Sequence, residues 1–166
     1  YIICSANTVP KKYLVICEEN IIFATYLSSF TTTKRNYSFK FMYKVSVVTP
    51  FHNVDMGMFQ KCADGMRCQT IGFENIEWII IVHNSEPHYF PLLTEMFKND
   101  KNVIIKELHD NMHSPASPRN YGMQFVTGPY LGFLDGDDNY TPDCLEVASR
   151  EMAETQSQVV TFRREY

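Results

Sequence analysis

Three carboxylates lie within four positions of one another, directly after an apolar run. The segment "YLGFLDGDDNYTP" (residues 130–142) places Asp135, Asp137 and Asp138 just beyond Leu134. Like charges this close repel one another, and burying them without a partner is costly. Mg²⁺ or Mn²⁺ prefers such oxygen ligands, removes the repulsion and can bridge to nucleotide phosphates. The residues therefore predict a Mn²⁺ or Mg²⁺ site at Asp135, Asp137 and Asp138. A solvated acidic turn is the alternative, because Asp, Gly and Asn are ordinary turn residues.

Two other kinds of acidic site need to be weighed for this segment. An EF-hand loop beginning at Asp135 would need Gly at its sixth position for the sharp turn, and Tyr140 stands there. A helix would also have to precede that loop, whereas the preceding pattern is that of a strand. A haloacid dehalogenase phosphatase also places an aspartate after an apolar strand, but it would want Thr or Val where this chain has Asn139. We exclude the EF-hand and keep the phosphatase as a weaker alternative.

Short apolar and β-branched segments that read as buried strands recur along the chain. They are residues 45–50, 77–84, 102–108, 130–135 and 158–164. Helices are predicted between them, around residues 58–66, 89–100, 117–128 and 141–156. The helix at 117–128 is expected to begin with Ser117 as N-cap and Pro118 at its first position.

Strands that alternate with helices predict an α/β fold, with a mostly parallel sheet and helices on both of its faces. The strands at 45–50, 77–84, 102–108 and 130–135 are expected to be neighbours. In such open sheets, ligands bind beyond the carboxyl ends of the strands. The polar strand ends "TPFHN", "VHNSE" and "LDGDD" should therefore lie close together and form the binding site.

Three segments, taken in order and spacing, resemble a known family. They are "KVSVVTPFHN", "EWIIIVHNS" and "SPRNYGMQFVTGPYLGFLDGDDNYTPDCLE". They are similar to the large inverting glycosyltransferase family of GT-A fold, family 2, which contains many bacterial sugar transferases. The resemblance covers residues 44–166 and implies the nucleotide-sugar-binding half of that Rossmann-like fold, which we expect to be truncated. Residues 1–43 are expected to be an N-terminal extension or the tail of a preceding region.

The resemblance also implies roles for particular residues. The donor-binding residues expected from it are Thr49, Pro50, Phe51, His52, Asn53, His83, Asn84, Arg119, Asn120 and Asp135. Arg119 would face the diphosphate or the base, and Asp137 would be the principal metal ligand. His83 and Asn84 stand where the family has two aspartates. An amide can both donate and accept, so we expect Asn84 to be able to turn either way toward a base.

The function that this resemblance implies is metal-assisted, inverting transfer of a sugar from a nucleotide-diphosphate sugar, a UDP-sugar above all, to an unknown acceptor. The catalytic base is expected to lie beyond Tyr166, so this chain is expected to bind a donor without necessarily transferring it. A noncatalytic nucleotide-binding or interaction module that kept the fold is the alternative. A nucleotidyltransferase is disfavoured, because "TPFHNVDMG" contains no Lys or Arg.

Composition narrows the remaining possibilities. A net charge of −4 does not suggest a nucleic-acid partner, which would need a basic stripe. No apolar stretch reaches the ~20 residues of a membrane span, and the chain opens without the pattern of a signal peptide. The five cysteines form no C-x-x-C pair, which fits reduced thiols. We expect a cytoplasmic location, with a peripheral position at the inner face of a membrane as the second option.

Overall fold

The structure is a computed structural model that describes residues 21–25, 45–155, 157 and 159–162. Its strands are β1 (Ile21–Thr25), β2 (Val45–Phe51), β3 (Ile76–His83), β4 (Val103–Leu108), β5 (Tyr130–Phe133) and β6 (Val159–Phe162). Its helices are α1 (Met56–Arg67), α2 (Tyr89–Met96), α3 (Ala116–Gly122) and α4 (Cys144–Thr155), with short 3₁₀ turns η1 (Phe73–Asn75) and η2 (Met123–Phe125).

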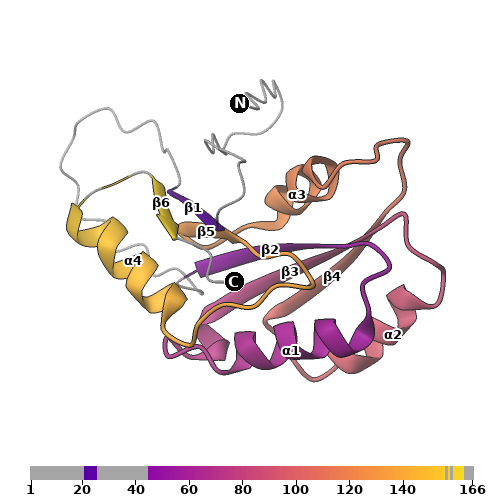
Figure 1. Ribbon diagram of the computed structural model, residues 1–166, viewed down its shortest axis with the longest axis horizontal. Coiled ribbons are helices and arrows are strands. Elements are labelled where there is room, and N and C mark those ends of the chain that lie inside the picture. Colours follow the sequence, from indigo (N-terminus) through magenta and orange to yellow (C-terminus); the bar gives the residue numbers. More distant parts are fainter. Residues whose placement is uncertain (1–20, 26–44, 156, 158, 163–166) are drawn as a thin grey trace.

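The described strands form one sheet in the order β4-β3-β2-β5-β1-β6. The pairs β4–β3, β3–β2 and β2–β5 are parallel, whereas β1 runs antiparallel to both β5 and β6. Helices cover both faces, with α1, α2 and α4 on one side and α3 on the other (Figure 1). The predicted α/β class and the four predicted neighbouring strands are therefore confirmed.

The core on each face comes from the same continuous apolar strands. Every residue of β3 is buried, which explains why its sequence does not alternate with polar positions. On the face covered by α1, α2 and α4, Trp78 stacks on Phe59 of α1 with ring centroids 5.9 Å apart. On the other face, Ile79 and Ile81 pack beneath the segment that contains Tyr121 of α3. The sheet is thus held from both sides, and its strand ends become a fixed platform.

Several helix boundaries differ from those predicted. Helix α3 spans only seven residues and passes into η2, and the N-cap position belongs to Pro115. Ser117 was wrongly predicted as the cap. It lies inside the helix, and its hydroxyl donates to the side chain of Asp110. Helix α2 ends at Met96, earlier than predicted. Helix α1 begins at Met56, two residues before the predicted start.

The amino-terminal region contributes one described element. Strand β1 lies between β5 and β6 within the sheet, so this part of residues 1–43 belongs to the same layer as the rest. The remainder of that region lies outside the described residues, and the division of the chain at residue 44 stays a prediction. Within the described ranges, no helix has the length and apolar character needed to cross a membrane.

Candidate functional site

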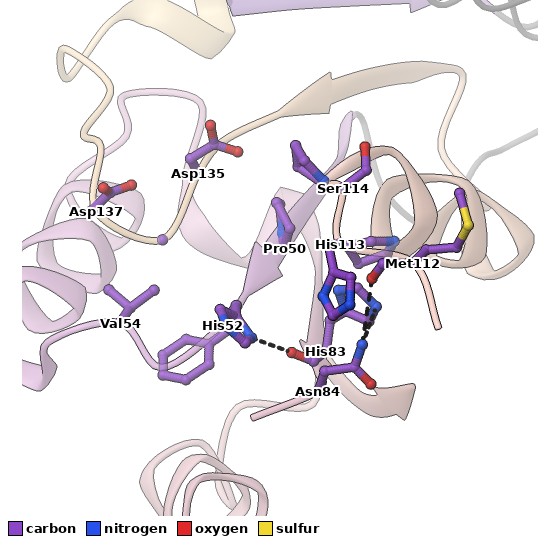
Figure 2. A pocket seen from close by; sticks show the side chains of 14 residues that line it. Pro50, His52, Val54, His83, Asn84, Met112, His113, Ser114, Asp135 and Asp137 are labelled. Carbon is purple, nitrogen blue, oxygen red and sulfur yellow. Dashed lines mark hydrogen bonds between the residues drawn. The ribbon is translucent and has the colours of Figure 1, made fainter. Parts of the chain in front are cut away.

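A cavity of about 350 Å³ opens at the carboxyl ends of the parallel strands. Its walls come from the ends of β2 and β3, the loop after β4, the start of α3 and the turn after β5 (Figure 2). The lining residues are Pro50, Phe51, His52, Val54, His83, Asn84, Met112, His113, Ser114, Pro115, Pro118, Asp135, Gly136 and Asp137. This is the location that the strand-end rule predicts for a ligand in an open α/β sheet.

One side of the cavity, which we call the carboxylate wall, consists of Asp135, Gly136 and Asp137. The backbone turns there because the N–H of Asp138 donates to the carbonyl oxygen of Asp135 over 3.0 Å. Gly136 is buried, and a Cβ at this position would approach Val54 to 3.3 Å. The tight turn therefore presents two carboxylates from one short segment while its glycine packs against the domain.

Cys62 of α1 lies beneath this turn. Its sulfur is 3.9 Å from the carbonyl oxygen of Asp135. Burial, followed by the negative charges of Asp138, Asp137 and Asp135, raises the pKa of the Cys62 thiol to about 12. The thiol is therefore protonated at neutral pH, and it supports the carboxylate wall by packing without adding charge.

Arg119 of α3 forms an ion pair with the carboxylate wall. Its Nη2 lies 2.6 Å from Oδ1 of Asp135, whose side chain remains 41% exposed. The guanidinium carbon also lies 5.9 Å from the ring centroid of Phe133. The helix therefore brings the predicted donor-binding arginine to the acidic turn, where one positive charge offsets part of the negative charge.

The opposite side, which we call the histidine wall, is formed by His52, His83 and Asn84. Nδ1 of His52 donates to the carbonyl oxygen of His83 over 2.8 Å, and this bond joins the ends of β2 and β3. Nε2 of His83 lies 2.8 Å from Oδ1 of Asp110. Figure 2 shows these side chains on the far side of the cavity from Asp135 and Asp137.

The amide of Asn84 is bonded at both ends. Its Nδ2 donates to the carbonyl oxygen of Asp110 over 2.9 Å, and its Oδ1 accepts the N–H of Asp110 over 3.1 Å. A backbone N–H can only donate, so these two bonds determine which way the amide faces. The expectation that Asn84 can turn either way is therefore wrong for this structure. The side chain anchors the loop after β4, and a role toward a base stays a prediction.

Sequence reasoning missed Asp110, which contacts His83, and also the lining residues of the loop after β4 and the start of α3. The carboxylate of Asp110 accepts hydrogen bonds from Ser117 and His83 and from the backbone N–H of Met112. The bond from Ser117, followed by the bond from His83, holds the pKa of Asp110 well below its ordinary value. The signal was present, because "HDN" (residues 109–111) comes directly after the third parallel strand and the strand-end rule applies to it equally.

The other predicted site residues do not line the cavity. Thr49 is buried, and its hydroxyl accepts the indole N–H of Trp78 over 2.8 Å. Asn53 has a φ of +47° and accepts the N–H of Glu86 over 2.9 Å, which joins two loops. Asn120 is half-buried on α3, and Asp138 is half-buried in the acidic turn. Their predicted roles toward nucleotide or metal stay predictions.

The donor atoms suit a metal that is shared with a ligand. The described part of the chain contains no group of three or more His, Cys, Asp or Glu side chains that could enclose an ion. Asp135 and Asp137 nevertheless line the same cavity. Mg²⁺ commonly binds through one or two carboxylates and completes its shell with substrate phosphates and water. The two residues fit that kind of site.

This chain is similar to known proteins of one family. Residues 46–166 match the family described as Glycosyl transferase family 2. A stretch of 100 residues is 32% identical to the minor teichoic acid biosynthesis protein GgaB of Bacillus subtilis, covering 59% of this chain and 11% of that protein. A stretch of 95 residues is 30% identical to the poly(ribitol-phosphate) beta-glucosyltransferase of Bacillus spizizenii, covering 57% and 15% respectively.

Solved structures share the fold. The S. aureus TarS 1-349 structure in complex with UDP-GlcNAc gives a TM-score of 0.61 at 22% identity, covering 68% of this chain and 32% of that one. The mannosyltransferase PcManGT from Pyrobaculum calidifontis, in complex with GDP-Man and Mn²⁺, gives 0.57 at 16% identity, covering 69% and 33%. This chain thus spans a small part of the curated relatives and about a third of each solved chain.

Proposed function

The chain belongs to glycosyl transferase family 2, and from that premise we propose that its cavity holds the donor of a sugar transfer, a nucleotide-diphosphate sugar. The observation that carries the proposal is that Asp135 and Asp137 both lie on one wall of a cavity at the strand ends. Carboxylates that face a cavity and leave acceptor sites open suit a metal–diphosphate group better than a structural role.

In this proposal the diphosphate lies at the carboxylate wall. Asp135 and Asp137 would hold Mn²⁺ or Mg²⁺, which supplies Lewis-acid stabilisation of the departing nucleoside diphosphate. Arg119, whose Nη2 lies 2.6 Å from Oδ1 of Asp135 although it does not line the cavity, would donate charge-assisted hydrogen bonds to phosphate oxygens. The nucleoside then extends along the cavity toward the histidine wall.

A uridine nucleotide is the donor that we propose, and the S. aureus neighbour solved with UDP-GlcNAc supports it. Inverting transfer to an acceptor is part of the same proposal and rests on the family alone. We also propose a cytoplasmic site of action. Cys62, Cys68 and Cys144 carry free thiols, which suits a reducing compartment.

Equilibrium binding by titration calorimetry tests the donor site. UDP and UDP-GlcNAc should bind the chain more tightly with Mn²⁺ than with EDTA, and Asp137→Ala should remove that difference. Asp143→Ala is the matched control, because Asp143 is exposed beyond the acidic turn and does not line the cavity. If no nucleoside diphosphate binds with Mn²⁺ present, the donor site is wrong and a noncatalytic interaction module becomes the better description.

A further inference from the structure

The two walls of the cavity differ in chemistry. The carboxylate wall is acidic, whereas the nearest side chains of the histidine wall are imidazoles and an amide. If the diphosphate lies at the carboxylate wall, as proposed above, the base of the nucleotide must lie toward the histidine wall. What those side chains can donate or accept then decides which bases fit.

The contacts of His83 determine its tautomer. Its Nε2 lies 2.8 Å from a carboxylate oxygen of Asp110. The lowered pKa keeps Asp110 ionised at neutral pH, and an ionised carboxylate can only accept. Nε2 must therefore carry the hydrogen, and in the neutral ring Nδ1 carries the lone pair.

Neighbouring groups leave this arrangement intact. The Nδ2 of Asn84 lies 3.1 Å from Nε2 of His83, but its hydrogens have carbonyl oxygens of Asp110 and Met112 as partners. Ser117 donates to the second oxygen of the Asp110 carboxylate. Asp110 is thus held by α3 on one side while it orients the imidazole on the other.

We infer that Nδ1 of His83 is a hydrogen-bond acceptor for the base, and that Asp110 is the positioning residue that keeps it so. This inference rests on the proposed function. The ligand chemistry it selects is a base with a ring N–H, either uracil through N3–H or guanine through N1–H. Cytosine presents a lone pair at its N3, so two acceptors would face each other and lose a hydrogen bond inside a partly desolvated site.

Nucleotide selectivity tests the inference directly. With Mn²⁺ present, UDP should bind at least tenfold more tightly than CDP, and 3-methyl-UDP, which lacks the N3–H, should bind as weakly as CDP. GDP and ADP form the second pair, because guanine carries a hydrogen on N1 and adenine does not. Comparing the affinity for GDP with that for UDP distinguishes a guanine site from a uracil site. In His83→Phe, which keeps an aromatic ring but loses the acceptor, UDP and CDP should bind within about twofold of each other.

A matched control is His88→Phe, the same substitution at an exposed histidine outside the cavity, which should keep the wild-type ratio of UDP to CDP affinity. An unchanged ratio in His83→Phe, or 3-methyl-UDP binding as tightly as UDP, overturns the inference even though nucleotides bind. Failure of every nucleoside diphosphate to bind the wild type overturns the proposed function itself, and this inference with it.

The tautomer is measurable without a ligand, which covers the case in which a variant does not fold. Long-range ¹H–¹⁵N correlation spectra of the wild-type chain should show His83 with a protonated Nε2 and an unprotonated Nδ1. A spectrum with hydrogen on Nδ1 contradicts the inference. In Asp110→Asn the amide can donate to Nε2, so the opposite tautomer should become populated and the ratio of UDP to CDP affinity should fall.

Discussion

The two ends of the sheet both contain carboxyl groups, and they use them differently. At the amino end, Glu77 of β3 is 2% exposed and accepts hydrogen bonds from Ser46 at 2.5 Å and from the N–H and hydroxyl of Thr127 at 2.7 Å each. At the carboxyl end, Asp135 is 41% exposed with Arg119 as its ion-pair partner, and Asp137 is exposed.

This difference separates a structural carboxyl group from a ligand-binding one. Both oxygens of Glu77 are bonded within the protein, so that group has little capacity left for a ligand. Its bonds tie the segment before β5 to β2 and β3. Asp137 keeps its acceptor sites on a cavity wall. Substitutions at the amino end should therefore lower the free energy of unfolding most and affect nucleotide binding least. Substitutions of Asp137 should do the reverse. Urea denaturation of each variant measures the free energy of unfolding.

Glu77→Ala should give the largest loss of stability, about 3 kcal/mol. It removes the acceptor for Ser46 and Thr127 and leaves their donors buried without partners. Glu77→Gln is the matched control. Its amide keeps one oxygen for these donors and can donate to the Thr127 hydroxyl, so it should lose only about 1 kcal/mol. Equal losses in the two variants would contradict the hydrogen-bond explanation and point to packing alone.

Arg119→Ala should come second, with a loss of about 1.5 kcal/mol, because its ion pair with Asp135 is partly buried and its guanidinium lies over the ring of Phe133. It should also weaken binding of all nucleoside diphosphates alike, by roughly tenfold, since the proposed contact is to phosphate and not to the base. Calorimetry with UDP, CDP and GDP checks this. A loss confined to one base would place Arg119 at the base instead.

The fold could be predicted from the sequence because its signals are local and repeated. Continuous apolar strands alternate with amphipathic helices, and this pattern alone implies parallel pairing and a site at the strand ends. The helix boundary at Ser117 could not be read in the same way. Ser before Pro is a good cap by local rules, but the hydroxyl binds Asp110 on a neighbouring loop, and that contact depends on tertiary structure.

The site was predicted in part for the same reason. His83 ends a strand, and Asn84, Asp135 and Asp137 lie just beyond strand ends; the structure brings all four to one cavity. Asp110 follows a strand too, but no family motif marks it, so its contact with His83 emerged only from the structure. Thr49 was predicted by the same rule, but it is buried and its hydroxyl accepts the indole N–H of Trp78, so its role toward a nucleotide stays a prediction.

Thr49→Val should lose about 1 kcal/mol of stability, the third effect in size, because the buried indole N–H of Trp78 loses its acceptor. Nucleotide affinity should not change, since Thr49 does not line the cavity. Thr49→Ser is the control, because it keeps the hydroxyl and removes only a methyl group. If Thr49→Val weakened UDP binding while Thr49→Ser did not, the hydroxyl would belong to the nucleoside pocket after all.

Asp137→Ala should have the smallest effect on the unliganded chain, within about 0.5 kcal/mol of the wild type. The side chain is exposed, and its removal relieves repulsion with its acidic neighbours, so a slight gain in stability is the expected direction.

With Mn²⁺ and UDP present, the stability of the two proteins should differ. A ligand at one hundred times its dissociation constant stabilises the folded state by about 2.7 kcal/mol, and only the wild type should show that gain. Urea denaturation of both proteins with and without Mn²⁺ and UDP measures the contrast. If Asp137→Ala destabilised the unliganded chain as much as Glu77→Ala, the carboxylate wall would be a structural element like the amino end of the sheet, and the difference between the two ends would disappear.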